Sequence, residues 1–319
     1  MQAYIIRRLI QGLGVLLVMS FVIYGLIGLM PGDPIDMMIQ ADPNLSTADA
    51  ARLRALHGLD RPIVERYWTW LGAALAGDFG YSRQFARPVL DVLLPRLGNT
   101  LLLMGVSFVL AIAIALPLGV AAARRPRSLA DQAINLLCFA GISVPAFWLA
   151  LLLIMLFAVT LGVLPAGGMA PAGMQNPGLL DRLPYLVLPV LTLTLASVAG
   201  LTRFLRASLI EAMREDYIRT ARAKGAGETR VLWRHGLRNA LIPVVTVMAL
   251  DFGTLFSGAL ITETMFAYAG MGKLIYDAIM NNDYNLALVG LLFATLVTLT
   301  ANLAADILYA RLDPRISYR

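Results

Sequence analysis

Six stretches of this sequence are long and apolar enough to cross a lipid bilayer, and they constrain the fold more than any other feature. A crossing helix needs about 20 mostly apolar residues, because the hydrocarbon core is about 30 Å thick. The stretches lie between charged residues at 9–30, 99–123, about 140–163, 183–202, 239–262 and 284–305. Lipid offers no partners to backbone N–H and C=O groups, so each crossing is predicted to be a helix. The predicted fold class is therefore an all-α polytopic membrane protein with six transmembrane helices.

Composition supports this class and excludes others. Of the 319 residues, 59% are apolar and 14% are charged, whereas a soluble domain averages about 45–50% and about 25%. The net charge of +6 does not indicate a nucleic-acid partner, because the basic residues lie between apolar runs and not on one soluble face. One cysteine, Cys138, excludes an internal disulfide. The two histidines, His57 and His235, are far apart, so no metal site is expected.

The third crossing is the hardest to delimit. No charged side chain occurs between Asp131 and Asp181, a distance too long for one span. Pro145 and the loop-like stretch 165–177 divide this segment. We therefore expect a single crossing at about 140–163.

The distribution of Lys and Arg predicts the orientation. Seventeen of the 26 Lys and Arg fall on the side that carries both termini, and nine fall on the other. Since cytoplasmic loops are enriched in Lys and Arg, both termini are predicted to be cytoplasmic. Residues 1–30 are interpreted as a retained first helix. Their apolar run exceeds a signal-peptide core and leads to Gly32-Asp-Pro34, not to an Ala-x-Ala cleavage site.

The polar segment 31–98 is predicted to be extracytoplasmic and partly helical. Ser46 is a plausible N-cap of a helix that Gly58 would end. A second helix, with Pro62 in its first turn, would end at Gly77. This segment is either a cap on the bundle or a docking surface for an extracytoplasmic partner, and the sequence favours neither.

The second polar segment, 203–238, is predicted to be a cytoplasmic loop that contains a short helix. Asp216 is the expected N-cap of this helix and Gly225 its left-handed C-terminal residue. Retention of positive charge inside accounts for the nine basic residues. It does not account for the capped helix or for the apolar residues that accompany it, Ile218, Val231, Leu232 and Trp233. A short amphipathic helix of this kind is suited to a groove on a soluble partner.

Motifs along nearly the whole chain are similar to those of one transporter family. In chain order they are Pro31-Gly-Asp-Pro34, Gly77-Asp-Phe-Gly-Tyr-Ser82, Asp216-Tyr-Ile-Arg-Thr-Ala-Arg-Ala-Lys-Gly225, Val231-Leu-Trp-Arg-His-Gly-Leu-Arg-Asn-Ala-Leu-Ile-Pro243, Thr262-Glu-Thr-Met-Phe266 with Gly270-Met-Gly272, and Leu308-Tyr-Ala-Arg-Leu-Asp-Pro-Arg-Ile316. Each motif alone is weak evidence for a family, whereas all of them in this order are strong evidence. Together they resemble the permease subunits of ABC importers, most of all the dipeptide/oligopeptide/nickel family with its type I importer fold.

One departure from the general importer pattern lies in the cytoplasmic loop. That pattern has Glu-Ala-Ala six residues before the loop glycine, where this chain has Arg219-Thr220-Ala221. No specific contact of that glutamate is therefore carried over.

The resemblance implies a division of labour between subunits. The expected partners are a second homologous permease subunit, two cytoplasmic ATPase subunits, an extracytoplasmic solute-binding protein and membrane lipid. The chain would be a non-catalytic transport subunit without a cofactor of its own, since ATP and Mg²⁺ would be bound by the ATPase subunits. In agreement, its one Gly-Lys pair, Gly272-Lys273, is followed by Leu274 and does not form a phosphate-binding loop.

The same resemblance assigns regions of the chain. Residues 1–30 would form the first transmembrane helix, 31–98 the extracytoplasmic insertion, and 99–319 a five-helix permease core with the coupling loop 203–238. The residues expected to couple to the ATPase are Tyr217, Ile218, Arg219, Thr220, Ala221, Arg222, Ala223, Lys224 and Gly225. The implied location is the bacterial inner membrane. The implied substrates are di- and oligopeptides or similar small solutes, with nickel chelates, glutathione and haem as alternatives.

Asp251 is an acidic residue about midway along the fifth apolar run. An ionised Asp there costs about 2.5–3.5 kcal/mol, so it is expected to face protein or a water-filled cavity. It either lines the substrate pathway or joins helices, with Gly253 permitting their close approach. A secondary transporter driven by ions is a further alternative for the chain. Such proteins usually show internal repeats and several ionisable residues near the midplane. This sequence has no clear internal repeat and one acidic residue near the midplane, Asp251.

Overall fold

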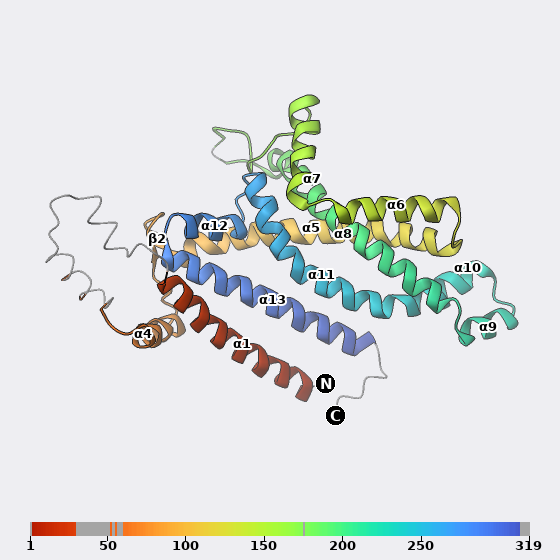
Figure 1. Cartoon of the computed structure of the whole chain (residues 1–319), viewed down its shortest axis with the longest axis horizontal. Coiled ribbons are helices and arrows are strands. Elements are labelled where there is room, and N and C mark those ends of the chain that lie inside the picture. The colour runs from red at the N-terminus through yellow and green to blue at the C-terminus, as the bar shows by residue number, and fades with distance from the viewer. Residues whose placement is uncertain (1, 30–51, 53–54, 56–59, 175, 313–319) are drawn as a thin grey trace. The chain divides into compact units, whose positions relative to one another are not determined.

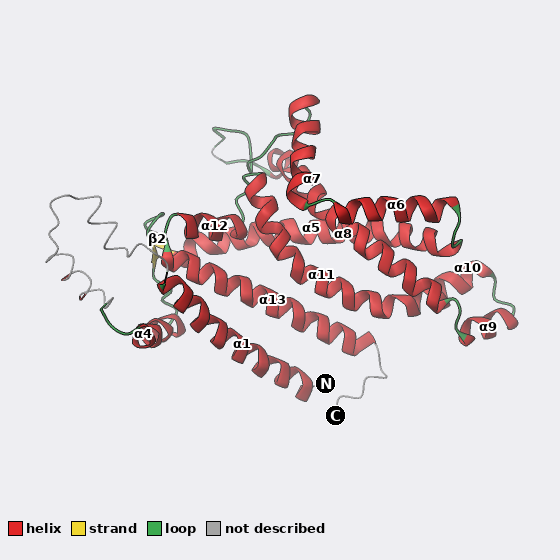
Figure 2. Ribbon diagram, viewed as in Figure 1, coloured by secondary structure: helices red, strands yellow, loops and turns green. Residues whose placement is uncertain are grey.

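The computed structural model describes residues 2–29, 52, 55, 60–174 and 176–312 of the chain. Most of these residues are helical, as Figure 2 shows, and they include one two-stranded hairpin. The elements, labelled as in Figure 1, are α1 (Gln2–Gly28), α4 (Ile63–Leu75), β1 (Tyr81–Ser82), β2 (Arg87–Pro88), α5 (Val89–Arg124), α6 (Leu129–Ser143), α7 (Ala146–Leu153), the π-helix η1 (Ile154–Thr160), α8 (Leu179–Ala212), α9 (Asp216–Ala223), α10 (Glu228–Arg230), the π-helix η2 (Val231–Leu237), α11 (Arg238–Met265), α12 (Met271–Met280) and α13 (Tyr284–Leu312).

The long helices agree with the predicted crossings. Within the described residues, five helices are long and apolar enough to span a membrane, namely α1, α5, α8, α10 to α11 taken together, and α13. A sixth candidate is the bent pair formed by α6 with α7 and η1. The prediction of an all-α polytopic membrane protein is confirmed.

The third predicted crossing differs from a straight span. A single helix was expected at 140–163, but the chain bends by 102° between Ser143 and Ala146. Pro145 is the physical reason. It lacks an N–H group and disfavours helical geometry at the preceding residue. Val144 is accordingly extended, with φ −90° and ψ 120°.

The contacts divide the chain into two compact units. The first consists of residues 1–8, 98–273 and 297–319. One hydrophobic core of this unit lies where α8 packs against the end of α5, η2 and the start of α11. The buried members are Val120, Ala123, Leu205, Leu209, Ala212, Leu232, Leu237, Ala240 and Val244. This core holds the predicted coupling loop on the end of α8.

The second unit consists of residues 9–97 and 274–296. Tyr67 of α4 is 2% exposed, and its hydroxyl lies 2.8 Å from Ser20 Oγ of α1. Helix α4 ends as predicted, because Gly77 adopts φ +89°. Pro62, expected in the first turn, is instead the residue just before the helix. The other predicted helix of this segment, from Ser46 to Gly58, lies outside the described residues except at positions 52 and 55.

The motif that begins at Gly77 forms a turn and a hairpin within the second unit. Ser82 donates a hydrogen bond of 2.5 Å to Asp283 Oδ2, and the Gln84 N–H donates one of 3.0 Å to the same oxygen. A Cβ at Gly80 would lie 2.9 Å from Asn285 Nδ2. The glycine therefore permits the turn to approach the start of α13.

Candidate functional site

The predicted coupling segment forms α9, a short helix that follows the end of α8 (Figure 1). The predicted N-cap is wrong by one residue. Glu215 occupies the cap position without a side-chain cap bond, and Asp216 is the first helical residue. The Asp216 carboxylate forms an ion pair with Arg219 one turn later, so it is engaged elsewhere than at the cap.

The C-terminal end of α9 confirms the predicted role of Gly225. This residue adopts φ +81°, the left-handed region that glycine enters without a Cβ penalty. Its N–H donates a hydrogen bond of 2.9 Å to the carbonyl oxygen of Arg222, and the N–H of Ala226 donates one of 3.1 Å to the carbonyl oxygen of Ala221. These two bonds are those of a Schellman motif, which ends the helix sharply at Lys224.

The nine predicted coupling residues divide into an anchored face and an exposed face. Ile218 is 0% exposed and Ala221 is 8% exposed, and both pack on Val231 in a small core. Burial of these side chains fixes the rotation of α9. The exposed members are Tyr217, Arg219, Thr220, Arg222, Ala223, Lys224 and Gly225.

An ion pair holds the end of α9 to α10. Arg222 Nε lies 2.7 Å from Glu228 Oε1, and Arg222 Nη2 lies 3.1 Å from Glu228 Oε2. The hydrogen bond to this carboxylate raises the pKa of the Arg222 guanidinium. Because the pair is solvent-exposed, its bidentate geometry orients α9 more than it stabilises the fold.

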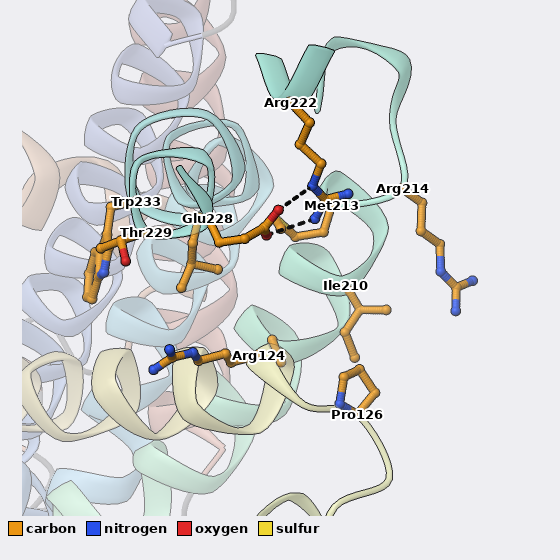
Figure 3. A pocket seen from close by; sticks show the side chains of 11 residues that line it. Arg124, Pro126, Ile210, Met213, Arg214, Arg222, Glu228, Thr229 and Trp233 are labelled. Atoms are coloured by element: carbon orange, nitrogen blue, oxygen red, sulfur yellow. Dashed lines mark hydrogen bonds and ion pairs between the residues drawn. The ribbon is translucent and has the colours of Figure 1, made fainter. Parts of the chain in front are cut away.

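A hollow of about 310 Å³ lies beside this ion pair (Figure 3). The pair forms one wall, and Arg124, Ile210 and Trp233 contribute other parts of the lining. Trp233 is 54% exposed. The surface around α9 is thus basic and aromatic, a combination enriched at protein interfaces.

Replacement of Gly225 with valine is expected to loosen the end of α9. A β-branched residue at φ +81° is strained by about 1–2 kcal/mol, so the last turn should fray. Trypsin should then cleave after Lys224 several-fold faster than in the unchanged chain. Gly227→Val is the control, since Gly227 has φ −64° and no atom within 4 Å of a Cβ position. Equal cleavage rates in the two variants would contradict the assigned role.

The motif Thr262–Phe266 forms a second site, built around the fully buried carboxylate of Glu263. Thr100 of α5 donates a hydrogen bond of 2.5 Å to Glu263 Oε1, and the Lys273 N–H donates one of 3.0 Å to Oε2. The Met271 N–H donates to Thr100 Oγ1 at 2.7 Å. Glu263 therefore joins α5, α11 and the start of α12.

The two glycines of this motif are explained by the same carboxylate. A Cβ at Gly270 would overlap the Glu263 carboxylate. A Cβ at Gly272 would lie 2.7 Å from Leu260 Cα and 3.0 Å from Glu263 Oε2. Burial raises the pKa of the nearby Tyr268 hydroxyl, and the negative charge of Glu263 raises it further, to about 12. The motif is thus a packed clamp on the segment 266–272.

Asp251, a predicted residue of the substrate pathway, is half-buried in α11. Two residues further on, a Cβ at Gly253 would lie 3.5 Å from Asn302 Oδ1. The expected close approach of helices therefore occurs at Gly253, between α11 and α13. The substrate-pathway role of Asp251 stays a prediction.

A buried ion pair between α6 and α8 was missed by sequence reasoning. Asp131 is 2% exposed and accepts bonds from Arg206 Nε at 2.5 Å and Arg206 Nη2 at 2.7 Å. It also accepts from the Arg127 N–H and from Asn135 Nδ2. The spacing Ser128-x-x-Asp131, a capping pattern, was the only local signal for this site. Nothing local indicated the pairing with Arg206.

Comparisons with known families agree with this architecture. Residues 115–318 match the family model "Binding-protein-dependent transport system inner membrane component". Residues 1–104 match the model of the N-terminal part of such membrane components. The two matches together include nearly every described helix.

Curated relatives are similar along their whole length. The oligopeptide transport system permease protein AppB of Bacillus subtilis is 41% identical over 319 residues, 100% of both chains. A putative peptide permease protein of Brucella ovis is 40% identical over 99% of both chains. The glutathione transport system permease protein GsiC of Escherichia coli K12 is 37% identical, again over 99% of both.

A solved structure supports the fold. A chain from the crystal structure of an amino acid ABC transporter with histidines superimposes with a TM-score of 0.54 at 14% identity, covering 69% of this chain and 94% of that one. Its identity is low, so this likeness concerns the fold alone. On the sequence matches, the chain belongs to the family of binding-protein-dependent transport system inner membrane components, as a permease of the dipeptide/oligopeptide type.

Proposed function

We propose that this chain is the transmembrane permease subunit of an ATP-driven, binding-protein-dependent importer of di- and oligopeptides or similar small solutes. It would form the translocation path with a second homologous permease, and two ATPase subunits would hydrolyse ATP. The names of the relatives, which include oligopeptide and glutathione permeases, support this substrate range. Glutathione, itself a small peptide, therefore remains the foremost alternative.

We further propose that both termini and α9 lie in the cytoplasm of a bacterial cell. The excess of Lys and Arg on that side supports this orientation. Segment 31–98 would then face the solute-binding protein.

The observation that carries the coupling role is the division of α9 into two faces. Ile218 and Ala221 anchor the helix, while Tyr217, Thr220 and Lys224 are presented outward. A rigid helix held in this way transmits displacement, so closure of the ATPase pair would bias the bundle between two arrangements.

Tyr217→Ala is expected to weaken the ATPase contact while the permease remains folded. Tyr217 is 39% exposed, and loss of an aromatic interface anchor typically costs about 2 kcal/mol or more. Retention of ATPase subunits on the detergent-purified chain should fall at least about tenfold. ATP-dependent uptake of a labelled tripeptide into proteoliposomes that contain all subunits should fall with it.

Tyr276→Ala is the matched control, because Tyr276 is a tyrosine of similar exposure, 44%, that lies on α12 and not on the coupling segment. Its ATPase retention should stay within about twofold of the unchanged chain. Equal losses in the two variants would contradict the assignment to α9. Recovery of the unchanged chain alone, transporting solute without ATP, would contradict the proposed function itself.

A further inference from the structure

A groove between α6 and α8 is separate from the α9 surface. It is lined by Asn135 and Phe139 of α6 and by Arg203, Phe204 and Ala207 of α8, and its volume is about 530 Å³. The groove thus combines two aromatic side chains with the arginines Arg203 and Arg206.

Two arginines border this groove, and a carboxylate neutralises the charge of only one of them within the described residues. Arg206 is neutralised by the buried carboxylate of Asp131. The guanidinium carbon of Arg203 lies 4.2 Å from the centroid of the Phe139 ring, in cation–π geometry. Within the described part of the chain, no carboxylate forms an ion pair with Arg203. Its charge is therefore available to an anion in the groove.

The position of Arg203 indicates what kind of anion this is. It directly follows the charge-free run 183–202, so it lies at the end of an apolar crossing, where lipid head groups are found. Neighbouring side chains of α6 point outward, since Leu136 is 71% exposed and Leu137 is 73% exposed. In a membrane-spanning protein, such side chains are suited to acyl chains.

We propose that this groove binds the phosphate head group of an anionic glycerophospholipid from the leaflet on the α9 side. Arg203 would pair with the phosphate, and Phe139 and Phe204 would contact the glycerol and upper acyl region. Basic pockets between transmembrane helices are known to take anionic head groups. A soluble anion would gain nothing from the apolar walls, which is why a lipid is the favoured source.

The test is native mass spectrometry of the purified complex after exposure to mixed micelles of phosphatidylglycerol and phosphatidylethanolamine. The unchanged chain should retain phosphatidylglycerol in preference. Arg203→Gln should lower this retention about fivefold, the effect expected for one basic residue near a lipid surface. Arg230→Gln, which removes an equal charge from an exposed site outside the groove, should leave retention unchanged.

A second variant tests the groove without altering charge. Ala207 is exposed on α8 and lines the groove, so Ala207→Trp should fill it and lower retention while the chain still folds. Equal retention of the two lipids, or equal loss in the Arg203 and Arg230 variants, would overturn the proposal. So would displacement of the bound lipid by millimolar glycerol phosphate, which would indicate a soluble anion. A disulfide from Ala207→Cys to a partner subunit would likewise overturn it.

Discussion

Gly270→Ala is expected to prevent the chain from folding to its native state. The new methyl group would overlap the carboxylate of Glu263. That carboxylate cannot move aside, because Thr100 and the Lys273 N–H hold its two oxygens at 2.5 and 3.0 Å. Overpacking a well-packed site costs about 1–3 kcal/mol and occasionally more. Here a buried acidic group would also lose its hydrogen bonds, so the cost should exceed about 3 kcal/mol.

The measurement is the fraction of chain recovered as a monodisperse species in mild detergent, together with its temperature of aggregation. Gly98→Ala serves as control, because Gly98 also lies near Thr100 but has no atom within 4 Å of its Cβ position. The control should be recovered like the unchanged chain, whereas Gly270→Ala should be recovered at a few per cent of that level. Normal recovery of Gly270→Ala would mean that the clamp around Glu263 is not packed as described.

The sequence predicted those features of the fold that depend on local information. An uninterrupted apolar run is sufficient to indicate a crossing helix, and the runs in α1, α5, α8, α11 and α13 did so. Gly77 and Gly225 were expected to end helices, and both have positive φ values. In each case a few neighbouring residues determine the outcome.

The features that were missed depend on residues far apart in sequence. Glu263 and Thr100 are separated by 163 positions, and Arg206 and Asp131 by 75. No pattern in one sequence states which acid meets which donor. The bend at Pro145 was missed for a different reason. Pro145 divides the apolar segment, but no charged side chain occurs between it and Asp131 or Asp181, so composition gave no sign of a change in direction.

The candidate site shows the same division. The sequence located the start of α9 within one residue and its end at Gly225. Both ends carry local signals, an acidic residue at the start and a glycine at the end. The sequence did not predict that Ile218 packs on Val231 or that Arg222 pairs with Glu228. Those contacts form only when the chain reverses after Gly225. Which face of α9 is available to a partner was thus a question for the structure.

Asp131→Asn is expected to be the most destabilising change in the contact between α6 and α8. Asp131 is buried and accepts two bonds from the Arg206 guanidinium. The Arg206 side chain keeps 25% of its surface exposed, so the cost arises mainly from the lost charge-assisted hydrogen bonds of Asp131, typically about 1.5–3 kcal/mol. The variant should therefore unfold at a clearly lower temperature in detergent and be recovered from membranes at reduced yield.

The double variant Asp131→Asn with Arg206→Met tests whether the pair itself stabilises the fold. When both charges are removed, no uncompensated charge remains, and replacement of a whole buried pair by apolar groups is often neutral. The double variant should thus regain most of the stability lost in Asp131→Asn. Arg230→Met combined with Asp131→Asn is the control, since Arg230 is exposed and should restore nothing. If the double variant were as unstable as the sum of its two single changes, the two side chains would not be energetically coupled, and the explanation by their ion pair would be wrong.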